Sequence, residues 1–287
     1  MTTIVCATDL SLRAALAVDR AVVLARRHLA RLLLLHVVDD DQPRAIVDAE
    51  MARARETLEA RLTELKGHDG PGFETEVRSG AVFQTITATA QEEDANLVVM
   101  GAHRKRILKD IFVGTTLERV MRTGSHPVLM VNAVTTAPYE SVLLAIDASE
   151  ASHRAVDAAK SLGFLDGVQL SVISAFEPVY KGMLDWAGVE ESAINEYSES
   201  WANETRVKVG DLLRQAGLQD GMMQVITEDG PPFMVIKRAV ARFAPQLLVI
   251  GTHGRTGIKR ALIGSVAEQV INQAECDVLV VPSRRNN

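Results

Sequence analysis

A glycine-rich loop near residue 250 carries the residue types and spacing best suited to chemistry. Gly251 and Gly254 follow an apolar run, and after nine further residues Gly264 and Ser265 open a helical pattern. Glycines let backbone N–H groups approach oxygen atoms closely, and a helix N-terminus adds N–H donors and the positive end of a dipole. The loop therefore indicates a site for an anion such as a phosphate group. The glycines alone leave open a second interpretation, a tight turn that needs glycine for its geometry.

Other catalytic and metal-binding patterns are missing from the sequence. The P-loop pattern G-x4-G-K-[S/T] does not occur, and Cys6 and Cys276 form no C-x-x-C pair. No Ser/His/Asp arrangement and no pair of carboxylates accompanies the glycine loop. His253 and its counterpart His103 are lone loop histidines, which are usually not metal ligands. We therefore predict no catalytic residues and no metal ligands among the side chains.

An internal repeat provides the elements that position this loop. Residues 80–131 align without a gap with residues 230–281, at an offset of 150, whereas residues 4–9 align with residues 142–147 at an offset of 138. The difference between the two offsets is an insertion of 12 residues between about 176 and 190. The chain is a tandem duplication, and we predict two domains, residues 1–134 and 138–287.

Short β-branched runs alternate with helical patterns in each copy. In the second copy, strands are expected at 141–146, 168–174, 224–228, 246–251 and 277–281, with Ser149 and Pro231-Pro232 starting helices. The run Leu247–Ile250 is apolar on both faces, which is typical of a central parallel strand. The sequence predicts an α/β fold with two tandem doubly wound, mostly parallel five-stranded sheets flanked by helices. In such sheets a ligand binds beyond the carboxyl ends of the strands.

The spacing of the loop resembles the nucleotide-binding motif of the universal stress protein family, G-x2-G-x9-G-[S/T]. Gly251, Gly254, Gly264 and Ser265 match this motif, and the resemblance extends over nearly the whole chain, twice. It implies an adenine-nucleotide alpha-hydrolase-like fold that binds ATP together with Mg²⁺. The two halves are further implied to pack through strands 128–131 and 278–281, with a homodimer between chains.

The resemblance also implies which residues bind the nucleotide. The triphosphate would lie across the glycine motif and the helix start, Asp147 on the nucleoside side, and Ala175 at the adenine pocket. The implied set is Asp147, Ala175, Gly251, Gly254, Gly264, Ser265 and Val266. The residues themselves leave open that Asp147 only caps its own turn and that Ser265 only caps its helix.

The first copy departs from the motif. Arg104 stands in place of the second glycine, whereas Asp9, Gly101, Gly114 and Thr115 are retained. A non-glycine residue costs roughly 1–2 kcal/mol if that position needs a positive φ, and its side chain would enter the phosphate path. We expect the first domain to bind ATP weakly or not at all, and to be structural or to take another ligand.

Composition narrows the class of protein. The formal net charge is −6, and the longest apolar run is far shorter than the ~20 residues of a membrane span. We therefore expect no nucleic-acid and no membrane partner, and the two widely separated cysteines, Cys6 and Cys276, predict a cytoplasmic protein. The leading hypothesis is a stress protein that uses ATP as a regulatory or structural ligand. A slow ATPase and a scaffold that never binds nucleotide are the alternatives. The insertion, with Tyr180 and Trp186, is either a lid or a packing loop.

Overall fold

The computed structural model describes residues 2–66, 72–102, 115–132, 137–178, 187, 189–219, 221, 223–252 and 263–282. The chain divides into two compact units. The first comprises Met1–Pro138, Arg260–Ile263 and Ala274–Asn287, and the second comprises Tyr139–Lys259 and Gly264–Gln273. The last strand of the second repeat therefore lies in the first unit.

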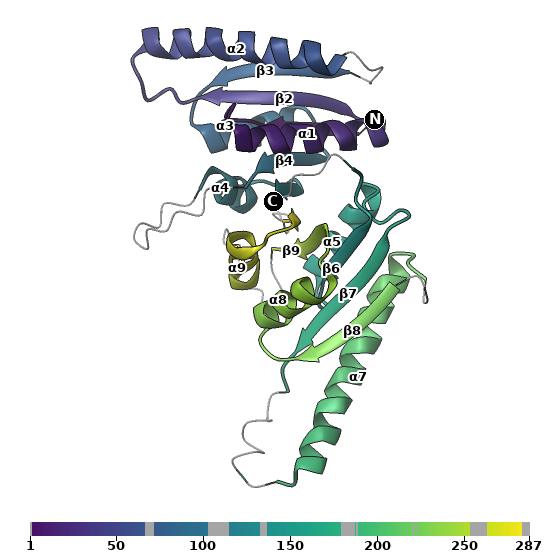
Figure 1. Cartoon of the computed structure of the whole chain (residues 1–287). Helices are drawn as coiled ribbons and strands as arrows, with labels where there is room; N and C mark the ends of the chain where they lie inside the picture. The colour runs from purple at the N-terminus through teal and green to yellow at the C-terminus, as the bar shows by residue number, and fades with distance from the viewer. Residues whose placement is uncertain are drawn as a thin grey trace. The chain divides into compact units, whose positions relative to one another are not determined.

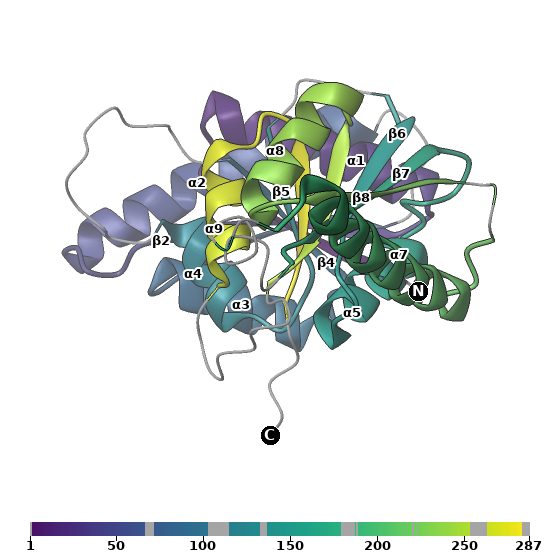
Figure 2. The ribbon, with the colours of Figure 1, turned by 90° about the horizontal axis from the view of Figure 1, so that it is seen from below.

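The first unit is a six-stranded sheet with helices on both faces (Figure 1). Its elements are β1 (Thr3–Ala7), α1 (Leu12–Arg27), β2 (Arg31–Val38), α2 (Arg44–Lys66), β3 (Phe73–Ser79), α3 (Val82–Glu92), β4 (Leu97–Gly101), α4 (Thr116–Thr123), β5 (Val128–Val131) and β10 (Asp277–Val281). The strand order is β3-β2-β1-β4-β5-β10, and only β10 is antiparallel to its neighbour β5. Right-handed crossovers place α1 and α2 on one face and α3 and α4 on the other (Figure 2).

The second unit repeats this arrangement with four parallel strands. Its elements are β6 (Ser141–Ala145), α5 (Glu150–Ser161), β7 (Gln169–Phe176), α7 (Glu191–Gln215), β8 (Met223–Asp229), α8 (Pro232–Phe243), β9 (Leu247–Gly251) and α9 (Ser265–Gln273). The strand order within the unit is β9-β6-β7-β8. In both units the strand order switches direction beside the first strand. The switch point lies between β1 and β4 in the first unit and between β6 and β9 in the second. A ligand is expected at that position.

The predicted fold class is confirmed, and the repeat is visible in the strand bounds. The first four strands of the two copies coincide residue for residue at offsets of 138 for β1 and β2 and 150 for β3 and β4. Ser149 caps α5 by accepting a hydrogen bond from the Ser152 N–H, and α8 begins at Pro232, both as predicted. The predicted pairing of strands 128–131 and 278–281 is also present, as the β5–β10 ladder.

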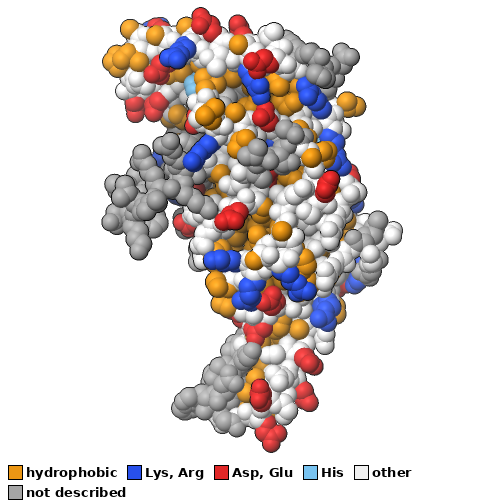
Figure 3. Space-filling model, in the orientation of Figure 1, with side chains coloured by type: hydrophobic (Ala, Val, Ile, Leu, Met, Phe, Trp, Pro, Cys, Tyr) orange, Lys and Arg blue, Asp and Glu red, His pale blue; other side chains and the backbone are white. Residues whose placement is uncertain are grey.

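The core follows the apolar strands. Leu97–Met100 of β4 and Leu247–Ile250 of β9 are buried on both faces, as expected for central parallel strands. Cys6 and Cys276 are buried free thiols, and burial raises the pKa of Cys6 far above its ordinary value, so this thiol is unreactive. Among the described helices, none combines the length and the apolar character that crossing a bilayer requires. On the face shown in Figure 3, basic and acidic side chains are interspersed, as on a solvated surface.

Candidate nucleotide site

The predicted site residues lie at the carboxyl ends of three neighbouring strands of the second unit. Asp147 follows β6, Ala175 lies near the end of β7, and Gly251 ends β9. β6 pairs with both other strands, because Ala145 is in register with Ile173 and with Ile250. The structure thus brings these three residues to one edge of the sheet. Gly254 lies outside the described residues.

Asp147 is held by the first turn of α5. Its Oδ1 accepts hydrogen bonds from the Ser149 N–H at 3.1 Å and from the Ser152 hydroxyl at 2.7 Å. The Ser152 Oγ in turn accepts the Asp147 N–H at 2.9 Å, and Ser152 is only 5% exposed. The capping role that the sequence left open for Asp147 is therefore present. Ser152 was not predicted, because a serine in the first turn of a helix gives no signal of a partner before the helix.

The glycines bring backbone segments close together. A Cβ on Gly251 would lie 3.0 Å from the Ala151 carbonyl oxygen, so only glycine lets the end of β9 pack this closely on α5. The Gly264 N–H donates to the Thr252 carbonyl at 2.7 Å and so ties the start of α9 to the end of β9. Ser265 and Val266 then begin α9, whose first-turn N–H groups have no acceptor within the helix.

A cavity of about 640 Å³ occupies the equivalent place in the first unit. Each described counterpart of a predicted site residue lines it. These counterparts are Asp9 for Asp147, Val37 for Ala175, Gly101 for Gly251, Thr115 for Ser265 and Thr116 for Val266. The volume falls in the range of about 300–1,000 Å³ that small-molecule sites occupy. These counterparts are far apart in the sequence, and yet they line one pocket. This is expected if the two copies of the repeat carry a site at the same place.

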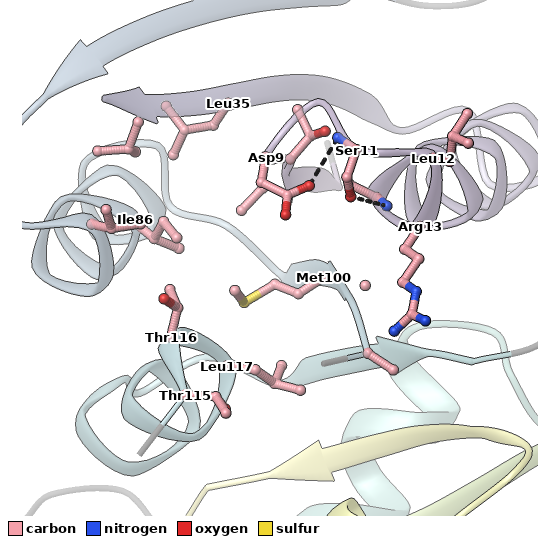
Figure 4. A pocket seen from close by; sticks show the side chains of 17 residues that line it. Asp9, Ser11, Leu12, Arg13, Leu35, Ile86, Met100, Thr115, Thr116 and Leu117 are labelled. Carbon is pink, nitrogen blue, oxygen red and sulfur yellow. Dashed lines mark hydrogen bonds between the residues drawn. The ribbon is translucent and has the colours of Figure 1, made fainter. Parts of the chain in front are cut away.

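The cavity combines an apolar slot with a polar rim. Figure 4 shows the carboxylate of Asp9 and the side chains of Met100 and Ile86 around the same space. The Asp9 Oδ1 accepts the Ser11 N–H at 3.0 Å, but Ala14 stands where the second unit has Ser152. At the mouth, Leu12 is 91% exposed. An apolar slot beside a carboxylate suits a ligand whose flat ring fills the slot and whose hydroxyl groups donate to the carboxylate.

The helix start at the cavity carries a reciprocal cap. Thr115 accepts the Glu118 N–H at 3.2 Å, and the Glu118 carboxylate accepts the Thr115 N–H at 3.0 Å. This reciprocal pair fixes the direction of α4, and with it the position of Thr115 and Thr116 in the lining.

Several predictions concern residues outside the described part of the chain. They include the substitution at Arg104, the loop histidines and the aromatic residues of the insertion, Tyr180 and Trp186. Among the described residues, one group of carboxylates could share a cation, the exposed Asp39, Asp40 and Asp41 after β2. Exposed acidic side chains in sequence repel one another and by themselves do not define a metal site.

Comparison with known proteins agrees with the fold and the repeat. A model of the universal stress protein family matches residues 1–132 and again residues 138–282. A universal stress protein of Mycobacterium bovis is 27% identical over 255 residues, covering 85% of this chain and 78% of that protein. Another from Mycolicibacterium smegmatis is 28% identical over 226 residues, covering 75% of this chain and 70% of that protein. The crystal structure of a universal stress protein from Archaeoglobus fulgidus has the same fold, with a TM-score of 0.72 at 19% identity, covering 99% of this chain and 97% of that one.

Proposed function

Because this chain belongs to the universal stress protein family, we propose that it is a stress-response protein whose second unit binds ATP as a regulatory or structural ligand. One observation carries the proposal. The described counterparts of the predicted nucleotide residues all line a single cavity in the first unit, at the carboxyl ends of β1 and β4. The second unit has the equivalents of β1 to β4, its helices α5 and α8 begin at the positions equivalent to the starts of α1 and α3, and its sequence keeps the complete glycine motif.

The residues of the second unit fit a nucleotide. Asp147, held by Ser152, would accept hydrogen bonds from ribose hydroxyls, and Ala175 would leave room for the adenine ring. Gly251, Gly254 and Gly264 would let backbone N–H groups reach the phosphates, with Ser265 and Val266 at the positive end of α9. Mg²⁺ would be held mainly by the phosphate oxygens, as is usual for this ion. At a concentration about 100 times Kd, ATP would stabilise the folded state by about 2.7 kcal/mol, enough to bias a conformation or an assembly.

For the first unit we propose weak or no ATP binding. Its lining keeps the carboxylate of Asp9, but Val37 is bulkier than Ala175 and Ala14 cannot hold the aspartate as Ser152 does. Arg104 further replaces the second glycine of the motif. The first-unit cavity then serves the structure of the unit or takes a different small molecule.

The proposal includes a cytoplasmic location and a homodimer. Two buried free thiols are consistent with a reducing compartment. Analytical ultracentrifugation of the full chain with and without ATP tests the dimer.

The decisive experiment extracts nucleotide from the purified full chain by heat and identifies it by chromatography. We expect ATP in the extract, a rise in Tm when ATP is added, and loss of both in Asp147→Asn. The matched variant Asp9→Asn in the first unit should keep both. Absence of nucleotide in the extract together with an unchanged Tm would favour a scaffold that does not bind nucleotide. ATP hydrolysis faster than about one turnover per minute would favour a slow ATPase; typical enzymes turn over faster than ~1 s⁻¹.

A further inference from the structure

The ladder between β5 and β10 is symmetric about its centre. Leu129 pairs with Leu279, its own counterpart in the repeat, and Met130 and Val128 pair with Val278 and Val280. Exchanging the two strands leaves this register unchanged. The backbone hydrogen bonds and the apolar side chains of the ladder are therefore those of a two-fold symmetric pair.

This symmetry creates an ambiguity of partner. A β5 strand could form the same register with β5 of a second chain, and β10 with β10 of a second chain. The backbone of an unpaired edge strand is a template for another strand, and it does not by itself distinguish β5 from β10. Contacts outside the ladder must therefore favour the pairing of β5 with β10 over the pairing of either strand with its own copy.

A buried ionic cluster lies at one end of the ladder. The Arg20 Nε of α1 is 3.2 Å from Asp277 Oδ2, with the two side chains 1% and 0% exposed. The Asn132 N–H donates to Asp277 Oδ1 at 2.8 Å, and its side-chain amide donates to the Cys276 carbonyl at 2.9 Å. Arg20 also donates from Nη1 to the Ala137 carbonyl at 2.7 Å. The cluster thus joins the first helix, the end of β5 and the start of β10.

The cluster does not follow the symmetry of the ladder. At the repeat offsets of 138 and 150, the counterparts of Arg20, Asp277 and Asn132 are Ala158, Pro127 and Pro282. Alanine and proline side chains carry no charge, and proline has no N–H to donate. The symmetric ladder therefore has one charged end and one apolar end.

We propose that Arg20 and Asp277 select which strands pair, so that the first copy of the repeat pairs with the second and neither pairs with itself. Two β5 strands would bring Arg20 against Pro127 at both ends and bury two guanidinium groups without an acid. Two β10 strands would bring Asp277 against Pro282 and Ala158 and bury two carboxylates without a donor. An unpaired buried charge is strongly unfavourable, whereas the paired charges of the β5–β10 ladder satisfy each other.

A double-mutant cycle in the full chain tests whether the two charges act on each other. We expect Arg20→Met and Asp277→Leu each to lower the Tm, because each leaves the other charge buried and unpaired. The double variant should have a higher Tm than either single variant, since it buries no charge. A Tm for the double variant that falls by the sum of the two single shifts would overturn the proposal. Arg20→Gln and Asp277→Asn replace the first pair if those single variants do not fold.

A second experiment tests the choice of partner. Full-length Arg20→Met with one affinity tag and full-length Asp277→Leu with another are unfolded and refolded together. When these chains exchange their last strands, Arg20 of the Asp277→Leu chain meets Asp277 of the Arg20→Met chain in one ladder. The other ladder then contains the two substituted, uncharged side chains. We therefore expect mixed-tag complexes at several times the level of a wild-type mixture.

The matched control uses Val128→Ala with Val280→Ala, which weakens the same ladder without altering a charge. This mixture should exchange no more than the wild type. Equal exchange in the control mixture and in the charged mixture would show that the ion pair does not select the partner, as would a charged mixture that stays at the wild-type level while both variants are folded.

Discussion

At the scale of single residues, the two copies of the repeat differ at Ser152, which corresponds to Ala14 in the first copy. Ser152 holds Asp147 by two reciprocal hydrogen bonds from a buried position in α5, whereas Ala14 leaves Asp9 with the Ser11 N–H. A carboxylate that is already oriented loses less freedom when it binds a ligand. For the proposed contact with a ribose, Asp147 is therefore better oriented than Asp9.

Ser152→Ala should weaken ATP binding by about 3- to 10-fold, because both hydrogen bonds between Ser152 and Asp147 are lost, and the one to the carboxylate, worth ~1 kcal/mol, orients it. Isothermal titration of the full chain measures this change. Ser161→Ala, an exposed serine at the other end of the same helix, is the control and should leave the affinity unchanged. Equal affinities of Ser152→Ala and wild type would remove Ser152 from the site.

His126 gives the protein a pH dependence of stability. Burial lowers the pKa of this half-buried imidazole below its ordinary value of 6.5, and the charge of Asp94 offsets only part of the effect. The unfolded chain therefore binds this proton at a higher pH than the folded chain does. Stability is present above the unfolded pKa and is lost as the pH falls below about 6.5.

We expect His126→Gln to flatten the decline of the urea midpoint between pH 7 and pH 5. The measurement is a set of urea titrations in that window for both proteins. A variant with the same slope as wild type would show that other groups set the pH dependence.

The sequence placed the candidate residues on the elements of the fold but did not predict their polar contacts. Asp147, Gly251 and Ser265 could be placed because each follows or precedes an element that the repeat defines twice. Ser152 and the Arg20–Asp277 pair could not, because their partners are set by packing. Arg20 and Asp277 are joined only when the last strand folds back to the first helix, and no local pattern encodes that contact.

At the scale of elements, α4 depends on its reciprocal cap. Thr115→Ala should lower the free energy of unfolding by about 1 kcal/mol, because an N-terminal N–H loses its acceptor. Urea unfolding followed by circular dichroism measures it. Thr123→Ala at the other end of the helix, whose hydroxyl donates to the Arg119 carbonyl, is the control and should cost less. A larger cost at Thr123 would contradict the role of the cap.

Strand positions were the most predictable part of the fold. The predicted strands 246–251 and 277–281 agree with β9 and β10 to within one residue, because apolar runs buried on both faces end sharply. The strand 168–174 is found two residues longer at its end, as β7, since Ala175 and Phe176 continue the ladder with Glu228 and Asp229. The end of β7 depends on how far the neighbouring strand β8 continues to pair with it, and the local sequence does not show this.

At the scale of the whole molecule, the first unit depends on a strand from the second repeat. Leu279 is fully buried opposite Leu129, so Leu279→Ala should lower stability by about 2–5 kcal/mol. We expect the loss to fall on the first unit. Hydrogen exchange followed by mass spectrometry should show weaker protection of 97–101 and 128–131, with a smaller change in 141–145. The reverse pattern would place β10 energetically with the second unit.

The place of β10 also affects how a nascent chain can fold. A ribosome adds about 5–20 residues per second, so β10 follows β5 by roughly 7–30 s. Throughout that interval the outer edge of β5 has no strand partner, and Arg20 has no carboxylate from residue 277. The sheet of the first unit is therefore completed only after nearly all of the second half of the chain has been synthesised. Chaperones that cover strand edges can act on β5 during this interval.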